Sequence, residues 1–151
     1  MDLKALCKAL WWSAGLLAGA CQAQMSPVGV WHTIDDATQQ PKGEVRITQN
    51  AAGILSGVVE RSLVPSPSTE TMCTLCTDDR KGQPKIGMEI IRGARKSEGK
   101  DVWEGGKILD PENGKEYSLR LTPIDGGSKL QVRGYIGAPL LGRSQTWVRV
   151  R

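Results

Sequence analysis

The chain has 151 residues and carries 20 basic against 16 acidic side chains, a mild net charge of +4. This length fits a single domain. The charges are interspersed and only residues 92–96 are locally basic, which excludes a continuous basic stripe, so we expect no nucleic-acid partner. Glycine is abundant at 18 residues, phenylalanine is absent, and short Val, Ile and Leu runs recur, which is typical of a β-rich chain.

The N-terminal region has the layout of a secretory signal peptide. Lys4 and Lys8 precede an uncharged apolar run over residues 9–20, and small residues at Cys21 and Ala23 mark a cleavage point. The run is too short to span a bilayer, so we expect no transmembrane segment in the mature chain. We therefore predict a signal peptide over residues 1–23 and one domain over residues 24–151, in a periplasmic or secreted protein.

Two alternatives to a cleaved signal peptide stay open. The stretch Ala18-Gly19-Ala20-Cys21 weakly resembles a bacterial lipobox, although Ala18 stands where leucine is usual. Lipid attachment at Cys21 would then anchor the chain to a membrane. The apolar run could instead form a buried N-terminal helix, which its charged flank and small-residue end disfavour.

The first predicted strand covers residues 29–34, and the clean alternation of residues 43–49 predicts a second. Six further runs follow, separated by turn signals of which the strongest are at residues 110–114, 125–127 and 137–139. A glycine pair, Gly105-Gly106, indicates a bulge or bend inside one of them. The six later strands are predicted at residues 54–60, 85–92, 102–110, 115–122, 129–136 and 143–150.

Eight antiparallel strands in simple succession must protect two sheet edges. Closing into a barrel removes both edges, and an eight-stranded barrel can be filled by side chains or can hold one small ligand. We therefore predict an all-β, eight-stranded antiparallel up-and-down barrel, with a two-sheet sandwich as the alternative. The irregular segment of residues 61–84, rich in Pro, Ser and Thr, is expected to cover one end of the sheet.

Cys73 and Cys76 are the two cysteines that remain once residues 1–23 are removed. In a secreted chain such a pair predicts a structural disulfide. Two other hypotheses stay open. A thioredoxin-like redox pair needs a helix N-terminus to lower a thiol pKa. A zinc site needs four ligands, and the single histidine, His32, lies far away in sequence, so we expect no metal and no cofactor.

Two short features link the first predicted strand to the last. A Gly29-x-Trp31 motif opens the first strand, and Arg149 follows Trp147 in the last. In both features the chain resembles lipocalins and their calycin relatives, in which an arginine of the last strand packs across the indole of the Gly-x-Trp motif. The resemblance implies that Trp31 and Arg149 close the barrel through a cation–π contact worth about 1 kcal/mol.

A denser set of motifs spans nearly all of the mature chain. These motifs are Gly29-x-Trp31, Cys73-x-x-Cys76, Asn113-Gly114-Lys115-x-Tyr117 and the runs at residues 105–111, 130–137 and 141–149. In them the chain resembles the uncharacterised bacterial domain-of-unknown-function family numbered 2147. The resemblance implies a small exported protein with a lipocalin-like barrel, and it supplies no reaction.

Little in the sequence indicates catalysis. A general base needs a nucleophile within hydrogen-bond reach, and no motif places one beside His32, so we assign no catalytic residue. Polar residues of the later strands either form a polar pocket floor or face solvent, and alternation with apolar neighbours favours solvent for Arg133 and Tyr135. The full polar set is Glu104, Lys107, Asp110, Arg133, Tyr135, Arg143 and Gln145.

The leading hypothesis is an exported binding module that takes a small apolar or amphipathic molecule at the open end of the barrel, under residues 61–84. The alternatives are an envelope structural or interaction protein with a filled barrel and, less favoured, a thiol–disulfide redox enzyme. The oligomeric state is left open. The candidate lining residues are Ile86, Met88, Ile90, Leu119, Leu121, Leu130, Val132 and Ile136.

Overall fold

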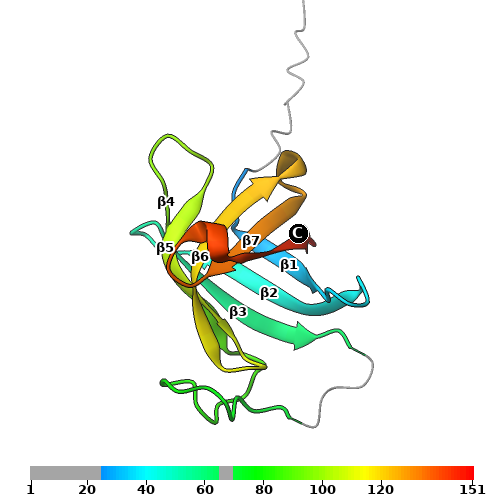
Figure 1. Ribbon diagram of the computed structural model, residues 1–151. Coiled ribbons are helices and arrows are strands. Elements are labelled where there is room, and N and C mark those ends of the chain that lie inside the picture. The colour runs from blue at the N-terminus through cyan, green and yellow to red at the C-terminus, as the bar shows by residue number, and fades with distance from the viewer. Residues whose placement is uncertain (1–24, 65–69) are drawn as a thin grey trace, which may run out of the picture.

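The computed structural model describes residues 25–64 and 70–151, and within them eight strands form a closed antiparallel barrel (Figure 1). The predicted signal peptide, the lipid attachment considered at Cys21 and the alternative of an N-terminal helix all concern residues outside the described ranges. The strands are β1 (Gly29–Ile34), β2 (Pro41–Gln49), β3 (Ile54–Ser62), β4 (Glu89–Lys96), β5 (Trp103–Asp110), β6 (Lys115–Ile124), β7 (Lys129–Tyr135) and β8 (Arg143–Arg149), with 3-10 turns η1 (Asp125–Gly127) and η2 (Pro139–Leu141).

Each strand pairs with its neighbours in the chain, and β1 closes the ring by pairing with β8. The predicted all-β, up-and-down barrel is therefore confirmed, and the sandwich alternative is excluded. No helix within residues 25–64 and 70–151 has the length and apolar character needed to cross a bilayer.

The fourth strand differs from its prediction, which placed it at residues 85–92 and a turn from residue 93. Residues 85–88 form a turn instead, in which Gly87 has φ +85° and the Met88 amide donates to the Lys85 carbonyl at 3.4 Å. Gly93, with φ +83°, lies inside β4 at an irregularity in its pairing with β3. Because glycine is common both in turns and in bulges, the sequence did not show that Gly87 belongs to a turn and Gly93 to a strand. The predicted bounds of the fourth strand were therefore wrong.

The glycine pair in β5 forms the predicted bulge. The β5–β6 register shifts between Glu104 and Gly106, and Gly105 has φ +78°. A Cβ atom on Gly106 would lie 2.3 Å from the amide nitrogen of Ala94 in β4. A glycine is therefore required there for β4 and β5 to approach each other.

Apolar side chains fill the end of the barrel that lies at residues 25–28 and at the turns of residues 50–53, 97–102 and 125–128. We call this end the closed end. Strand alternation sends these side chains inward. Burying each one contributes roughly 1.5–3 kcal/mol, so this packing is a major source of the stability of the barrel. Its fully buried members include Trp31, Ile47, Leu55, Leu119, Leu121 and Leu130.

Arg149 joins the first and last strands at the closed end. Its guanidinium carbon lies 4.2 Å from the centre of the Trp31 ring. A Cβ atom on Gly29 would lie 2.5 Å from Nη1 of Arg149, so the glycine of the Gly-x-Trp motif makes room for the guanidinium group. The same guanidinium donates to the carbonyl oxygens of Gly127 at 2.6 Å, Val28 at 2.8 Å and Ser26 at 2.5 Å.

Candidate functional site

The opposite end of the barrel, which we call the mouth, leads into a cavity of about 790 Å³. The connections at residues 35–40, 111–114 and 136–142 surround the mouth, together with the described parts of the β3–β4 connection at residues 63–64 and 70–88. A volume of this size lies within the range of small-molecule sites. The apolar lining of the cavity includes Val45, Val59, Ile90, Ile108, Leu109, Val132 and Trp147.

Three residues of β8 line the cavity, and two of them make polar contacts at its rim. Arg143, Gln145 and Trp147 alternate on one face of the strand and all line the cavity. The Gln145 amide donates to Oδ2 of Asp36 at 2.9 Å, and Arg143 forms an ion pair with the same carboxylate. These contacts link β8 to the β1–β2 connection across the mouth.

Neutral hydrogen-bonding groups stand around the apolar lining. Tyr117, Tyr135 and Asn113 line the cavity together with Gln145. A phenol or an amide can donate and accept hydrogen bonds without carrying charge. The lining thus combines an apolar floor with polar and charged groups at the mouth, such as Lys42, Asp110 and Arg143, and this combination can orient an amphipathic molecule.

Charges at the mouth are largely matched in pairs. Nζ of Lys42 lies 2.8 Å from Oε2 of Glu112, and Arg143 pairs with Asp36. Arg61 lines the cavity, and its Nη2 lies 2.8 Å from Oε2 of Glu44, which alternates with Val45 on β2 and does not line the cavity. The hydrogen bond from Arg61 lowers the pKa of Glu44, against the opposing effect of burial, so this carboxylate is ionised at neutral pH. The rim therefore does not present a strong field of one sign to an entering ligand.

The predicted lining residues divide into two groups. Ile90 and Val132 line the cavity from inside the barrel, and Ile86 and Ile136 line it from connections at the mouth. Met88, Leu119, Leu121 and Leu130 do not line it, although all four are buried in the core. Leu119, Leu121 and Leu130 point inward as expected but lie too near the closed end, where neighbouring side chains cover them. Met88 lies in the turn before β4 instead of on a strand, and it packs into the core.

The polar set of the later strands is also divided. Asp110, Tyr135, Arg143 and Gln145 line the cavity, whereas Glu104, Lys107 and Arg133 do not. The expectation that Tyr135 faces solvent was therefore wrong, because this residue ends β7 at the mouth. Each of the three that do not line the cavity bonds elsewhere. Glu104 accepts from Ser97 and Arg120, Lys107 donates to Ser118, and Arg133 donates to carbonyl oxygens of η2.

Val59, Ile108 and Trp147 line the cavity and were missed as candidates from the sequence. Alternation gives the inward face of a strand but not the depth of a residue along the barrel axis. The position of a residue along its strand could have identified these lining residues, since Val59 lies near the end of β3 that approaches the mouth. Depth also depends on register and bulges, which a single sequence does not fix.

A disulfide-bonded segment of the β3–β4 connection covers part of the mouth. Cys73 and Cys76 are joined by a disulfide and both are buried. The Cys73 amide donates to the Gln83 carbonyl at 2.9 Å, so the segment folds back on itself. In Figure 1 this segment, in green, runs below the strand ends. Glu70 and Thr71 line the cavity, which agrees with the expected covering role of residues 61–84, and Lys85 and Ile86 just beyond that range line it as well.

Arg80 fastens this segment to the barrel wall. The side chain is only 4 % exposed, and its guanidinium pairs with Asp78 and with Glu116 of β6, the latter at 2.7 Å. It also donates to the Glu89 carbonyl at the start of β4 at 3.0 Å. Hydrogen bonds from the Arg80 side chain and backbone lower the pKa of Asp78 to about 2.

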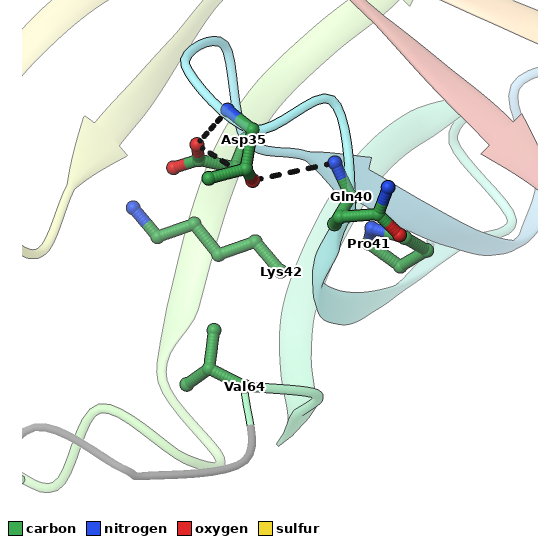
Figure 2. A pocket seen from close by; sticks show the side chains of 6 residues that line it. Asp35, Gln40, Pro41, Lys42 and Val64 are labelled. Atoms are coloured by element: carbon green, nitrogen blue, oxygen red, sulfur yellow. Dashed lines mark hydrogen bonds between the residues drawn. The ribbon is translucent and has the colours of Figure 1, made fainter.

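A smaller hollow of about 330 Å³ lies beside the mouth (Figure 2). The Asp35 carboxylate caps the β1–β2 connection by accepting from the amides of Ala37 and Thr38, and the bonds from Thr38 lower its pKa. Figure 2 shows the stem of Lys42 between Asp35 and Val64. All three of these residues also line the large cavity, so the hollow is an annex of the mouth.

Catalytic chemistry finds little support in the described geometry. Nε2 of His32 lies 3.2 Å from Oε2 of Glu44, on the strand face opposite Trp31 and away from the core. Within residues 25–64 and 70–151, no group of three or more His, Cys, Asp or Glu side chains is placed to hold a metal ion.

Comparison with known proteins agrees with this architecture. A family model described as an uncharacterized protein conserved in bacteria (DUF2147) matches residues 29–149. No curated protein matches the sequence. The solved structure of protein HP1028 from the human pathogen Helicobacter pylori, described as belonging to the lipocalin family, is similar with a TM-score of 0.68 and 17% identity over 82% of each chain. At this identity the similarity shows the fold alone.

Proposed function

This chain belongs to the DUF2147 family of uncharacterized proteins conserved in bacteria, and we propose that it is an exported binding protein that holds a small apolar or amphipathic molecule in its barrel. The cavity at the mouth is the observation that carries the proposal. Its floor is apolar and its rim supplies neutral donors and acceptors, so it suits a molecule with an apolar body and a polar end.

The cavity also favours binding over the alternative of a filled barrel with a purely structural role. About 790 Å³ at the mouth contrasts with the solid packing at the closed end. The thiol–disulfide hypothesis has less support, because a reactive cysteine pair needs solvent access and both sulfur-bearing residues are buried.

Export is proposed from the N-terminal layout, and the disulfide is consistent with an oxidising compartment. Fractionation of cells that express the full chain, with mass determination of the recovered protein, tests this part. We expect a periplasmic or secreted form that begins at residue 24. A full-length protein in the cytoplasmic fraction would overturn export, and a mass increase from an acyl group on Cys21 would establish the lipid-anchored alternative.

Filling the cavity tests the binding function. Val132 on β7 is 4 % exposed and lines the cavity, whereas its neighbour Gln131 is exposed on the opposite face of the same strand. We expect Val132→Trp to weaken binding of a fluorescent fatty-acid probe at least about tenfold, because the indole occupies ligand space. Gln131→Trp is the matched control, and the probe should bind it as it binds the unmodified protein. Equal binding by both variants would contradict the proposal.

A further inference from the structure

Large exposed apolar side chains gather around the mouth of the barrel. Leu140 is 91 % exposed, Leu141 is 81 % exposed and Ile136 is 68 % exposed, and all three belong to the β7–β8 connection. Val64 and Ile86 of the β3–β4 connection are exposed as well. We call these five residues the apolar rim. Water contact with so many large apolar groups at one end of a small protein indicates an interaction surface.

The apolar rim is continuous with the lining of the cavity. Val64, Ile86, Ile136 and Leu141 are exposed to solvent and also line the cavity. Apolar surface therefore runs from the floor of the barrel, past the rim, to the Leu140 side chain outside. A molecule with an apolar body could follow these side chains into the barrel, beside the polar and charged groups that also line the mouth.

The leucine pair is held on a turn whose backbone groups are already bonded. The Leu141 amide donates to the Ala138 carbonyl at 3.0 Å, and the Gly142 amide donates to the Pro139 carbonyl at 3.3 Å. The Arg133 guanidinium donates to the Pro139 carbonyl at 2.6 Å and to the Leu140 carbonyl at 3.3 Å. A turn with internally satisfied polar groups can enter an apolar medium at a small cost in desolvation.

The balance of charge at the mouth points to the kind of surface that the apolar rim fits. Lys42 pairs with Glu112, and Arg143 pairs with Asp36, so the rim carries no strong field toward a charged macromolecule. A second copy of the chain placed mouth to mouth would seal both cavities from their ligand. A lipid bilayer instead accepts protruding leucine side chains and is the place where apolar and amphipathic molecules collect.

We propose that the apolar rim docks the barrel mouth on the surface of a lipid bilayer, and that an amphipathic molecule passes there between the membrane and the cavity. This inference rests on the proposed binding function and adds the source of the ligand. Docking is apolar in origin, so it should persist in high salt, because salt screens charge and strengthens apolar association.

Flotation with phosphatidylcholine vesicles tests the docking surface. We expect the unmodified protein to float with the vesicles at low and high salt, and the double variant Leu140→Ser/Leu141→Ser to partition about tenfold less. The matched control is Val148→Ser/Val150→Ser, which removes two exposed apolar side chains far from the mouth. All three proteins are prepared as the form that begins at residue 24, so the apolar run of residues 9–20 makes no contribution to vesicle binding.

Two further readouts separate docking from the binding function. Probe binding without vesicles should be the same for the leucine variant and the unmodified protein. Equal flotation of the leucine variant and the unmodified protein would overturn docking and leave the binding function standing, whereas absence of probe binding in every protein would overturn the binding function itself. Sedimentation that shows a dimer, dissociated by the leucine substitutions, with no flotation would assign the rim to a second copy and also overturn docking.

Discussion

Arg149 is the side chain that ties the seam between the first and last strands. It covers the ring of Trp31 and donates to three backbone carbonyls from the N-terminal segment and from η1. Charged hydrogen bonds of this kind, together with a cation–π contact, stabilise more than an exposed ion pair does. The stability of the closed end therefore depends on the Arg149 guanidinium group.

We predict that Arg149→Ala lowers the free energy of unfolding by about 3 kcal/mol, because three carbonyl oxygens lose a charged donor and the Trp31 ring loses its cover. Denaturant unfolding of the purified protein measures this. Arg151→Ala is the control, since Arg151 is largely exposed and lies 3.8 Å from its partner Glu44. That change should stay within about 0.5 kcal/mol. Equal effects of the two substitutions would contradict the assigned role.

Asp78 should make the stability of the protein depend on acid. Its pKa in the folded protein is about 2, below the ordinary value of 3.8, chiefly because the Arg80 side chain donates to it. A lowered folded pKa gives stability that is fully present above about pH 4 and is lost as the pH falls toward 2. Asp78 is partly exposed, so solvent screening reduces this contribution to about 1 kcal/mol.

We therefore predict that Asp78→Asn lowers the free energy of unfolding by about 1 kcal/mol at pH 7, and that the difference from the unmodified protein shrinks between pH 4 and pH 2. Unfolding curves of both proteins across this range provide the measurement. Other carboxylates with lowered pKa, such as Asp79 and Glu104, titrate in both proteins, so the difference isolates Asp78. If the difference in unfolding free energy between the two proteins did not change with pH, the charge of Asp78 would not contribute to stability.

At the scale of elements, the disulfide-bonded segment is the part of the β3–β4 connection that is fixed to the barrel. The loop closed by Cys73 and Cys76 is short, so the chain-entropy model gives a stabilisation of about 2 kcal/mol. We expect the double variant Cys73→Ala/Cys76→Ala to lose about that amount in denaturant unfolding. Because both cysteines are buried, we also expect slow reduction by mild thiol in the folded state. Rapid reduction with unchanged stability would instead favour redox chemistry.

Most strands could be placed from the sequence because alternation and turn residues agree with one another. The β5–β6 turn and the bulge at Gly105–Gly106 were predictable for this reason. The fourth strand was displaced by four residues because Gly93 reads as a turn residue, whereas in the fold it lies within β4, at an irregularity in its pairing with β3. A glycine alone does not tell a turn from a bulge, and the partner strand decides.

For the molecule as a whole, the sequence was sufficient for a closed barrel but not for the extent of its cavity. Ile90 and Val132 line the cavity, whereas Leu119, Leu121 and Leu130 face the same interior at a depth that is already filled. Alternation is a property of one strand, while depth depends on the register of all strands together. The solid closed end and the hollow mouth therefore emerge only from the assembled structure.

The proposed binding function follows from the difference between the packed closed end and the hollow mouth of the barrel. The closed end supplies stability through its apolar core and the Arg149 seam. The mouth leaves space bounded by Val132 and Trp147, with polar groups such as Gln145 around it. A protein that served only as a structural element would gain stability by filling that space.

Native mass spectrometry of the protein, purified without detergent from cells that express the full chain, is the decisive test of the binding function. We predict a species heavier than the polypeptide by the mass of one small molecule, which organic solvent releases and which is absent from Val132→Trp. A single species with the mass of the polypeptide alone, in both the unmodified protein and Val132→Trp, would contradict the claim that the barrel carries a ligand.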